Sequence, residues 1–256
     1  MKVYEAVLDQ LLGAGVTHFA GMVGSTSAPY ASALAAQNKA RYVGIRHEQV
    51  AAAILDATAR LNGQPGCLMV HGGSGLLAAS LGIGSAALDG TPMVVLSATQ
   101  ERKAMENGWW QTLDVQKPVA DFVKFQTRIE RPDQAVAAVR NALRESVSGK
   151  PGVAQIDIPI DVSTEELGVS SLPTPVWSAT PQVRSFPDPA LVGKTLELLR
   201  NASRPVLLIG GGANYSGAGA ALLQLAEHLG APVVNSPTSR GVLPETNSLV
   251  LGCAGI

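Results

Sequence analysis

Two short stretches of the sequence place titratable and small polar side chains beside elements that could present them to a ligand. Residues 46–48 read Arg-His-Glu and come directly before a run whose apolar residues recur at helical spacing. Residues 71–75 read His-Gly-Gly-Ser-Gly and follow a short apolar stretch typical of a buried strand. A carboxyl group and an imidazole in such places are candidates for proton transfer.

The acid of the first stretch, Glu48, has two interpretations. An acid in the first turn of a helix is stabilised by the helix dipole, which by itself explains its presence. A partly buried carboxyl group can also exchange a proton with the ring nitrogen of a heterocycle, because apolar surroundings raise the pKa of a carboxyl group. The residues around Glu48 leave both interpretations open.

The second stretch resembles two pieces of hydrolase machinery but matches neither. A His-Gly-Gly run forms the oxyanion hole of some hydrolases, and G-x-S-x-G carries their nucleophile. Here Leu76 stands where the last glycine is needed, and the later histidine, His228, falls within a predicted helix. These features disfavour a serine hydrolase, while a histidine that simply ends a buried strand stays an alternative for His71.

Two glycine-containing stretches further along the chain disfavour the common nucleotide motifs. Residues 210–212 follow a predicted strand and open a helix, but the third glycine and the later acid of the dinucleotide fingerprint are missing. Tight packing of strand against helix is the preferred explanation, with a nucleotide site second. The Gly-Lys-Thr at 193–195 lacks the preceding glycine of a P-loop.

Composition excludes several classes of protein. The chain has 256 residues, of which 46% are hydrophobic, and its net charge of −1 gives no basic surface for nucleic acid or an anionic membrane. No run of about 18 apolar residues predicts a membrane span. The N-terminal segment is amphipathic and carries acids, unlike a signal peptide. Two distant cysteines without a CxxC motif favour a reduced, cytoplasmic protein.

Short apolar strands alternate with alanine- and leucine-rich helices through the first part of the chain. This alternation predicts an α/β fold, a parallel sheet with helices on both faces. An extended segment is expected at 41–45. The other strands and the helices are predicted at 18–24, 66–73, 91–98 and 152–162, and at 3–15, 50–63, 74–90 and 131–149.

Proline, serine and threonine dominate residues 163–188, where helical periodicity is lost. This predicts a linker at 166–188 between a domain at 1–165 and a second unit at 189–256. In the second unit we expect helices at 189–202 and 216–230, the latter capped by Ser216 and ended by Gly230, and strands at 204–212 and 231–236. Two clear strands predict only a partial Rossmann-like domain, so the chain is either one part of a split protein or a fragment.

Five segments, taken in order, resemble one enzyme family. They are VTHFAGMVGS, RHEQVAAAILDATARLNGQPG, GSGLLAASLGIGSAALDGTPMVVLSA, SGKPGVAQIDIPIDV and RPVLLIGGGA followed by LAEHLGAPVVNS. Together they are similar to thiamine-diphosphate (ThDP) enzymes of the acetolactate synthase, pyruvate oxidase and benzoylformate decarboxylase group. The resemblance implies a pyrimidine-binding domain, a linker and the beginning of the family's central Rossmann-like domain.

The resemblance also implies roles for individual residues. Glu48 matches the glutamate that bonds N1′ of the cofactor's aminopyrimidine and activates the cofactor, whose chemistry serves 2-oxo acid decarboxylation. Ser25 and His71 match pocket residues of the benzoylformate decarboxylase type, although Ser25 could equally be a plain turn serine. Trp110 and Gln111 partly match a Phe-Gln-Glu segment of acetolactate synthases. The remaining expected pocket residues are Gly24, Thr26, Gly72, Gly73 and Ser74, with Trp109 as a further wall.

One departure from the family shapes the expected function. The Gly-Asp-Gly…Asn stretch that holds Mg²⁺ and the diphosphate does not occur in the sequence. We therefore expect the pyrimidine-side subunit or portion of a ThDP-dependent 2-oxo acid decarboxylase or carboligase. Its Mg²⁺-binding domain would come from a partner chain or a missing C-terminal half, within an oligomer. A non-catalytic remnant of the fold and a nucleotide-binding module stay open as alternatives; flavin has no supporting residue.

Overall fold

The computed structural model describes residues 1–173 and 185–254, which belong to two compact units, Met1–Gln182 and Val183–Ile256. Each unit is described by itself. Residues 174–184 of the predicted linker lie outside the described residues, and the predicted domain boundaries stay a prediction. Across the described ranges, no helix is both long and apolar enough to cross a membrane.

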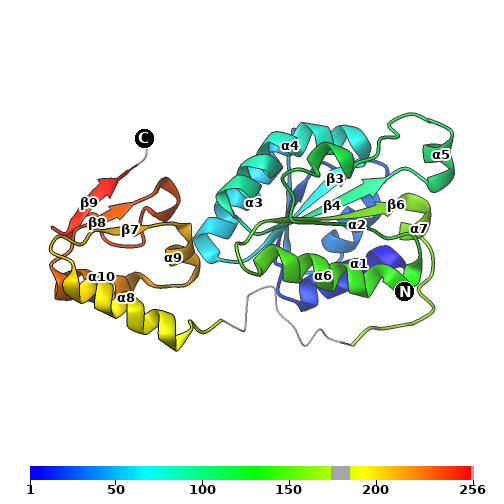
Figure 1. Ribbon diagram of the computed structural model, residues 1–256. Coiled ribbons are helices and arrows are strands. Elements are labelled where there is room, and N and C mark those ends of the chain that lie inside the picture. The colour runs from blue at the N-terminus through cyan, green and yellow to red at the C-terminus, as the bar shows by residue number, and fades with distance from the viewer. Residues whose placement is uncertain (174–184, 255–256) are drawn as a thin grey trace. The chain divides into compact units, whose positions relative to one another are not determined.

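Within residues 1–173, one sheet of six parallel strands forms the centre of the first unit (Figure 1). Its order is β2-β1-β3-β4-β6-β5, and every neighbouring pair is parallel. Because all strands point the same way, their carboxyl ends meet at one edge, where ligands of open α/β sheets bind. The strands are β1 (His18–Gly21), β2 (Arg41–Gly44), β3 (Gly66–His71), β4 (Met93–Thr99), β5 (Phe125–Arg128) and β6 (Val153–Pro159).

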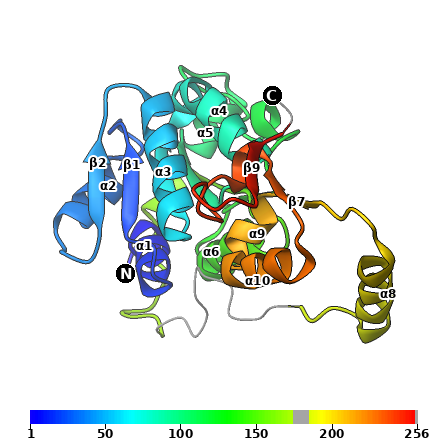
Figure 2. The same cartoon turned by 90° about the vertical axis from the view of Figure 1, so that its left-hand side faces the viewer.

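Helices cover both faces of this sheet, as the sequence predicts. The helices of the first unit are α1 (Val3–Gly13), α2 (Ala28–Ala35), α3 (Glu48–Asn62), α4 (Gly72–Asp89), α5 (Arg102–Glu106), α6 (Ala135–Val147) and α7 (Ile160–Ser163), with 3-10 turns at Lys117–Val119 and Pro132–Gln134. Helices α3 and α4 lie side by side on one face (Figure 2), and α1, α2 and α6 pack on the other.

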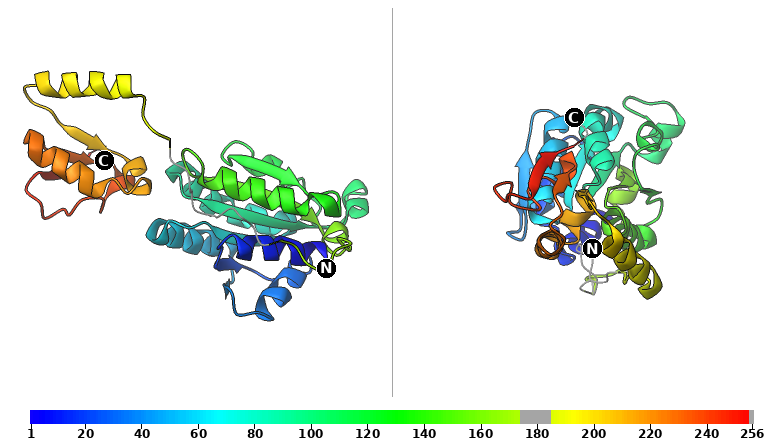
Figure 3. Two further views of the ribbon diagram at one scale, coloured as in Figure 1. Left: turned by 90° about the horizontal axis from the view of Figure 1, so that it is seen from below. Right: turned by 60° about the vertical axis from the view of Figure 1, so that its left-hand side comes forward.

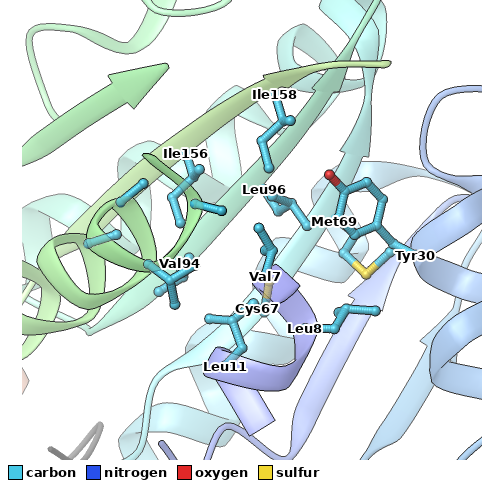
Figure 4. Close-up of a cluster of buried hydrophobic side chains, with 14 of the residues drawn as sticks. Val7, Leu8, Leu11, Tyr30, Cys67, Met69, Val94, Leu96, Ile156 and Ile158 are labelled. Carbon is cyan, nitrogen blue, oxygen red and sulfur yellow. The ribbon is translucent and has the colours of Figure 1, made fainter. Parts of the chain in front are cut away.

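Alternating side chains of the central strands divide the core between the two faces. In β3, Cys67 and Met69 belong to the cluster beneath α1, α2 and α6, whereas Leu68 and Val70 belong to the cluster beneath α3 and α4. Successive residues of a strand point to opposite faces, so a strand buried on both faces is apolar throughout. Figure 4 shows the first cluster, in which Val7 and Leu11 of α1 face the sheet.

Helices α2, α5 and α7 and strand β5 of the first unit were not predicted from the sequence, and α7 (Ile160–Ser163) replaces the end of the strand expected at 152–162. Helix α2 has eight residues and α5 has five, too few to display two periods of apolar spacing. Strand β5 lies at the edge of the sheet, and all four of its residues are only partly buried. Its sequence Phe-Gln-Thr-Arg therefore carries no apolar run.

The second unit contains a parallel sheet of three strands within residues 185–254 (Figure 3). Its strands are β7 (Leu207–Ile209), β8 (Val233–Asn235) and β9 (Val250–Cys253), and its helices are α8 (Pro189–Asn201), α9 (Gly211–Tyr215) and α10 (Gly219–Leu229), with a 3-10 turn at Pro237–Ser239. Strand β9 adds a third strand to the two that the sequence predicts.

One predicted cap in the second unit is wrong. Ser216 follows the last residue of α9, and α10 begins two residues after the expected start, with Ala218 at its N-cap. The unpredicted turn of helix α9 uses the residues expected to lead into α10. The predicted C-terminal stop is confirmed, because Gly230 ends α10 with φ +59°, a conformation that glycine adopts without strain.

Candidate functional site

The candidate site lies at the carboxyl edge of the six-stranded sheet, where β3 passes into α4 and α3 begins. His47 is the N-cap of α3, and its Nδ1 atom accepts a hydrogen bond from the backbone N–H of Gln49 at 3.3 Å. This cap fixes the start of the helix, so that the next residue, Glu48, occupies its first turn. Arg46 and His47 are exposed, whereas the Glu48 side chain turns inward.

The Glu48 side chain is nearly buried, and its carboxylate has no partner in the part of the chain that the structure describes. The residue is 5% exposed, and no hydrogen bond or ion pair among the described residues involves its carboxylate. Buried carboxylates normally have a partner, because desolvation of an unpaired charge is costly. The first turn of α3 offers only the partial charge of its N–H groups. The Glu48 carboxylate thus stays available to a group that binds at this edge of the sheet.

His71 ends β3 and is held by contacts at both ring nitrogens. Its Nδ1 lies 2.6 Å from the hydroxyl oxygen of Thr26, and its Nε2 lies 2.7 Å from Oε1 of Gln111. Gly24 allows this arrangement, because a Cβ atom at position 24 would collide with the imidazole ring. The side chains of residues 26 and 111 thus fix the plane of the ring.

The hydrogen bonds of His71 would differ between its neutral and protonated rings. In the neutral ring, Nε2–H donates to Gln111 while the Thr26 hydroxyl donates to Nδ1. In the protonated ring, Nδ1–H donates to the Thr26 oxygen, whose hydroxyl then donates to the carbonyl of Ala98. The gain of a proton is accompanied by one rotation of the Thr26 hydroxyl, and the backbone N–H of Thr26, which donates to Nδ1 at 3.4 Å, then loses its acceptor. Proton transfer at His71 would therefore change the hydrogen bonds of Thr26.

Gln111 links His71 to the start of α4. Its Nε2 donates to the Ser74 hydroxyl at 3.1 Å, so that the amide joins an imidazole and a hydroxyl. Gln111 has φ +58° and is the one non-glycine residue of the described chain with positive φ. Such strained conformations persist where the surrounding structure determines them, and they gather at functional sites.

A cavity of about 500 Å³ opens beside Thr26. Ser25 contributes an exposed hydroxyl to it, while the Thr26 side chain is buried and bonded to His71 and Ala98. The cavity combines hydroxyl, amide, charged and aromatic walls. It is lined by Ser25, Thr26, Gln100, Glu101, Lys103, Ala104, Asn107, Trp109 and Ile160.

The other predicted site residues fall into two groups. Gly72, Gly73 and Ser74 form the first turn of α4, where Gly72 has φ +51° and a Cβ atom on Gly73 would lie 2.5 Å from Cβ of Leu113. Trp110 is 68% exposed and is absent from the cavity wall. The structure thus gathers the glycines and the serine near His71, but leaves Trp110 facing solvent.

Sequence reasoning missed the cavity-lining residues of the segment from the end of β4 to the residue after α5. Gln100, Glu101 and Lys103 belong to no recognisable motif, and Asn107 precedes a glycine as in an ordinary turn. One general signal applied to them, since residues that follow a parallel strand lie at the ligand-binding edge of a sheet.

Comparison with known protein families matches both units. Residues 1–118 match the model described as "Thiamine pyrophosphate enzyme, N-terminal TPP binding domain", and residues 192–256 match "Thiamine pyrophosphate enzyme, central domain". The chain belongs to the thiamine pyrophosphate enzyme family. This confirms the resemblance read from the sequence, and the parallel α/β architecture agrees with it.

Curated relatives of this thiamine pyrophosphate family chain have several activities. It is 31% identical to a probable acetolactate synthase large subunit of Methanocaldococcus jannaschii, over 100% of the chain and 44% of the relative. It is 32% identical to 2-hydroxyacyl-CoA lyase 1 of Mus musculus, over 87% and 38%. For oxalyl-CoA decarboxylase of Escherichia coli the identity is 30%, over 84% and 38%. The chain thus spans less than half the length of these relatives.

The residues at the sheet edge fit one part of thiamine diphosphate. A buried carboxylate without a partner suits a ring nitrogen that can share a proton with it. The same residues do not provide a metal site, because no group of three His, Cys, Asp or Glu side chains that could hold a metal ion occurs in residues 1–173 or 185–254. The described residues therefore fit the heterocycle and do not form a centre for its metal.

Proposed function

We propose that this chain is the pyrimidine-side portion of a ThDP-dependent enzyme that acts on 2-oxo acids, by decarboxylation or carboligation. The single observation that carries the proposal is the nearly buried Glu48 side chain, whose carboxylate has no partner among the described residues and lies at the ligand-binding edge of the sheet. When bound, the cofactor would supply the carbanion-stabilising chemistry.

The chain's own residues would have distinct tasks in this reaction. Glu48 would hold or release a proton at the nitrogen of the pyrimidine ring. His71 would give or take a proton at the reacting carbon, because contacts at both ring nitrogens hold the imidazole in place at the edge of the sheet. Ser25, exposed in the cavity wall, would donate a hydrogen bond to the substrate carboxylate. The glycines of the first turn of α4 would let the ligand approach the backbone.

The cavity beside Thr26 would receive the rest of the substrate. Lys103 offers a positive charge and Asn107 an amide, while Trp109 offers an aromatic wall. This combination favours a 2-oxo acid over a purely aliphatic compound, because the polar lining would lose its water without compensation against an apolar chain. Trp110, directed to solvent, would contact the substrate only after another surface covers it.

A partner would complete the site. Helix α4 exposes Leu77, Leu81 and Leu88, which are spaced by four and seven residues and so share one side of the helix. Leu81 is 67% exposed and Leu88 is 75% exposed. Exposed apolar rows of this kind favour contact with another protein surface. We assign the missing Mg²⁺ and diphosphate ligands to that surface, on a further domain or a second chain.

The proposal is tested with Glu48→Gln, which keeps the side-chain volume and removes the charge. ThDP binding is measured by calorimetry, and CO₂ release from a panel of 2-oxo acids is measured after addition of a diphosphate-binding domain. We expect Glu48→Gln to lose at least about tenfold in rate, as removal of a proton-transfer group does. The matched control is Glu227→Gln, an exposed acid of α10. A Glu48→Gln variant equal to the unsubstituted protein would refute the proposal.

A second candidate function, nucleotide binding, is supported by Asn235 at the end of β8. The residue is fully buried, and both polar atoms of its amide lack partners among the described residues. It pairs with Ile209, directly before the glycines at 210–212. Buried amides normally have partners, so an adenine nucleotide is a candidate ligand. Calorimetry with ADP, repeated on the Asn235→Ala variant, tests nucleotide binding at this place. Absence of binding heat from the unsubstituted chain would refute it.

A further inference from the structure

The loop between α5 and β5 is bound to the sheet by two amide side chains, that of the buried Gln155 and that of the partly buried Gln126. We infer that Gln155, in the middle of β6, is a positioning residue that acts on His71 through this loop. The inference rests on the proposed role of His71 in the site. The loop carries Gln111, whose Oε1 lies 2.7 Å from Nε2 of His71.

Gln155 is a polar residue in a place where the fold favours an apolar one. It is fully buried in a strand whose other residues are buried as well. Its Nε2 donates to the carbonyl of Val115 at 3.1 Å and to the hydroxyl of Ser97 at 3.0 Å. An apolar residue at 155 would leave the Val115 carbonyl buried without a donor. The Gln155 amide therefore serves to hold the loop between α5 and β5 against the sheet.

A second amide extends the attachment by one residue. Gln126 of β5 donates through Nε2 to the carbonyl of Gln116 at 2.7 Å and to Oε1 of Gln155 at 2.8 Å. Two consecutive carbonyls of the loop are thus bound by two amides that also bind each other. The side chain of Val115, between them, is fully buried in the core beneath α3 and α4.

Three residues separate the anchor at Val115 from Gln111. Between them, Leu113 packs against Gly73, since a Cβ atom at position 73 would lie 2.5 Å from Cβ of Leu113. Gln111 itself has φ +58°, which a non-glycine residue keeps only under constraint from its surroundings. The anchor at Val115 supplies that constraint from the carboxyl side. Release of the anchor would let Gln111 leave the strained conformation and the imidazole.

The test observes the imidazole directly, without cofactor or substrate. The chain contains four histidines, so ¹⁵N-histidine labelling gives few ring signals, and His71→Gln assigns those of residue 71. Gln111→Met reports the signals of a ring that has lost its Nε2 partner. We expect Gln155→Met to change the ¹⁵N chemical shifts of the His71 ring in the same direction as Gln111→Met does, at fixed pH.

The control variant is Val139→Ala, which removes buried volume from α6 on the opposite face of the sheet. It should leave the His71 signals unchanged. If Gln155→Met does not fold, Gln126→Met replaces it, because Gln126 is only partly buried and binds the next carbonyl. Unchanged His71 signals in the folded variant, with shifted signals in Gln111→Met, would overturn the inference. Failure of the proposed function would show instead as an inactive enzyme with these signals responding as expected.

Discussion

Gly75 lies against the Glu48 carboxylate: a Cβ atom at position 75 would stand 3.1 Å from Oε1 of Glu48. The two residues come from the first turns of neighbouring helices, α4 and α3. The glycine thus leaves the carboxylate the space that it occupies at the edge of the sheet. A methyl group there would be closer than an ordinary contact, so the carboxylate would have to move by a few tenths of an ångström.

Gly75→Ala should therefore reduce activity more than stability. Alanine gains about 1 kcal/mol over glycine within a helix, and overpacking costs about 1–3 kcal/mol. We expect the free energy of unfolding to fall by no more than about 2 kcal/mol. A displaced Glu48 should lower the rate of CO₂ release about tenfold to a hundredfold, because small misplacements of reacting groups are costly. Urea unfolding and the decarboxylation assay measure the two effects.

Gly84→Ala is the matched control in the same helix. A Cβ atom at position 84 would lie 3.9 Å from the nearest atom, in the ring of Phe122, which is an ordinary contact. We expect this variant to gain about 0.5–1 kcal/mol in stability and to keep its activity. Equal activities of the two alanine variants would contradict the importance of the space beside Glu48.

Thr26→Val tests the hydroxyl that joins His71 to the Ala98 carbonyl. Valine keeps the shape of the side chain but removes the donor, so the protonated imidazole loses its acceptor at Nδ1. We expect about tenfold slower turnover and about 1–2 kcal/mol lower stability, from the unpaired carbonyl. Thr26→Ser, which restores the hydroxyl, should recover most of the rate. Full activity of the valine variant would exclude a role for this contact.

The fold could be predicted because the informative elements are long and buried. An apolar run indicates strand β3, and apolar residues at helical spacing indicate helices α3 and α4. Gly63 and Gly90, which adopt positive φ, end these two helices. Short or edge elements such as α5 and β5 bury too few apolar residues to give a pattern. Their positions are decided by tertiary contacts, which local sequence does not encode.

The candidate site could be predicted in part, and for a physical reason. Glu48 and His71 stand at strand and helix boundaries, so their positions follow once the parallel sheet is predicted. The role of Gln155 could not be read in this way. Its partner, Val115, lies 40 residues away in sequence, and only the folded sheet brings the two together. The strain at Gln111 is likewise set by both ends of its loop.

Leu81→Lys should weaken self-association while it leaves the fold intact. The side chain is 67% exposed in the described structure, so a charge there should change the stability of the unit by no more than about 0.5 kcal/mol. If the row of leucines on α4 contacts a partner, a desolvated lysine should raise the dissociation constant at least about tenfold. Sedimentation velocity over a range of concentrations measures this. Leu61→Lys, at the far end of α3 and 89% exposed, is the matched control.

Cys67 should make the stability of the first unit depend on alkaline pH. The residue is fully buried in β3, and burial raises the pKa of its thiol above the ordinary value of 9.0. Above pH 9 the unfolded chain loses this proton while the folded chain keeps it, so the folded state binds more protons. The free energy of unfolding therefore falls as pH rises through this range, by up to about 1.4 kcal/mol per pH unit.

Cys67→Ala should remove that part of the slope between pH 8 and 10.5 in urea titrations, whereas Cys253→Ala, which replaces a partly exposed thiol, should retain it. Parallel curves for the protein and its Cys67→Ala variant would show that the thiol does not contribute.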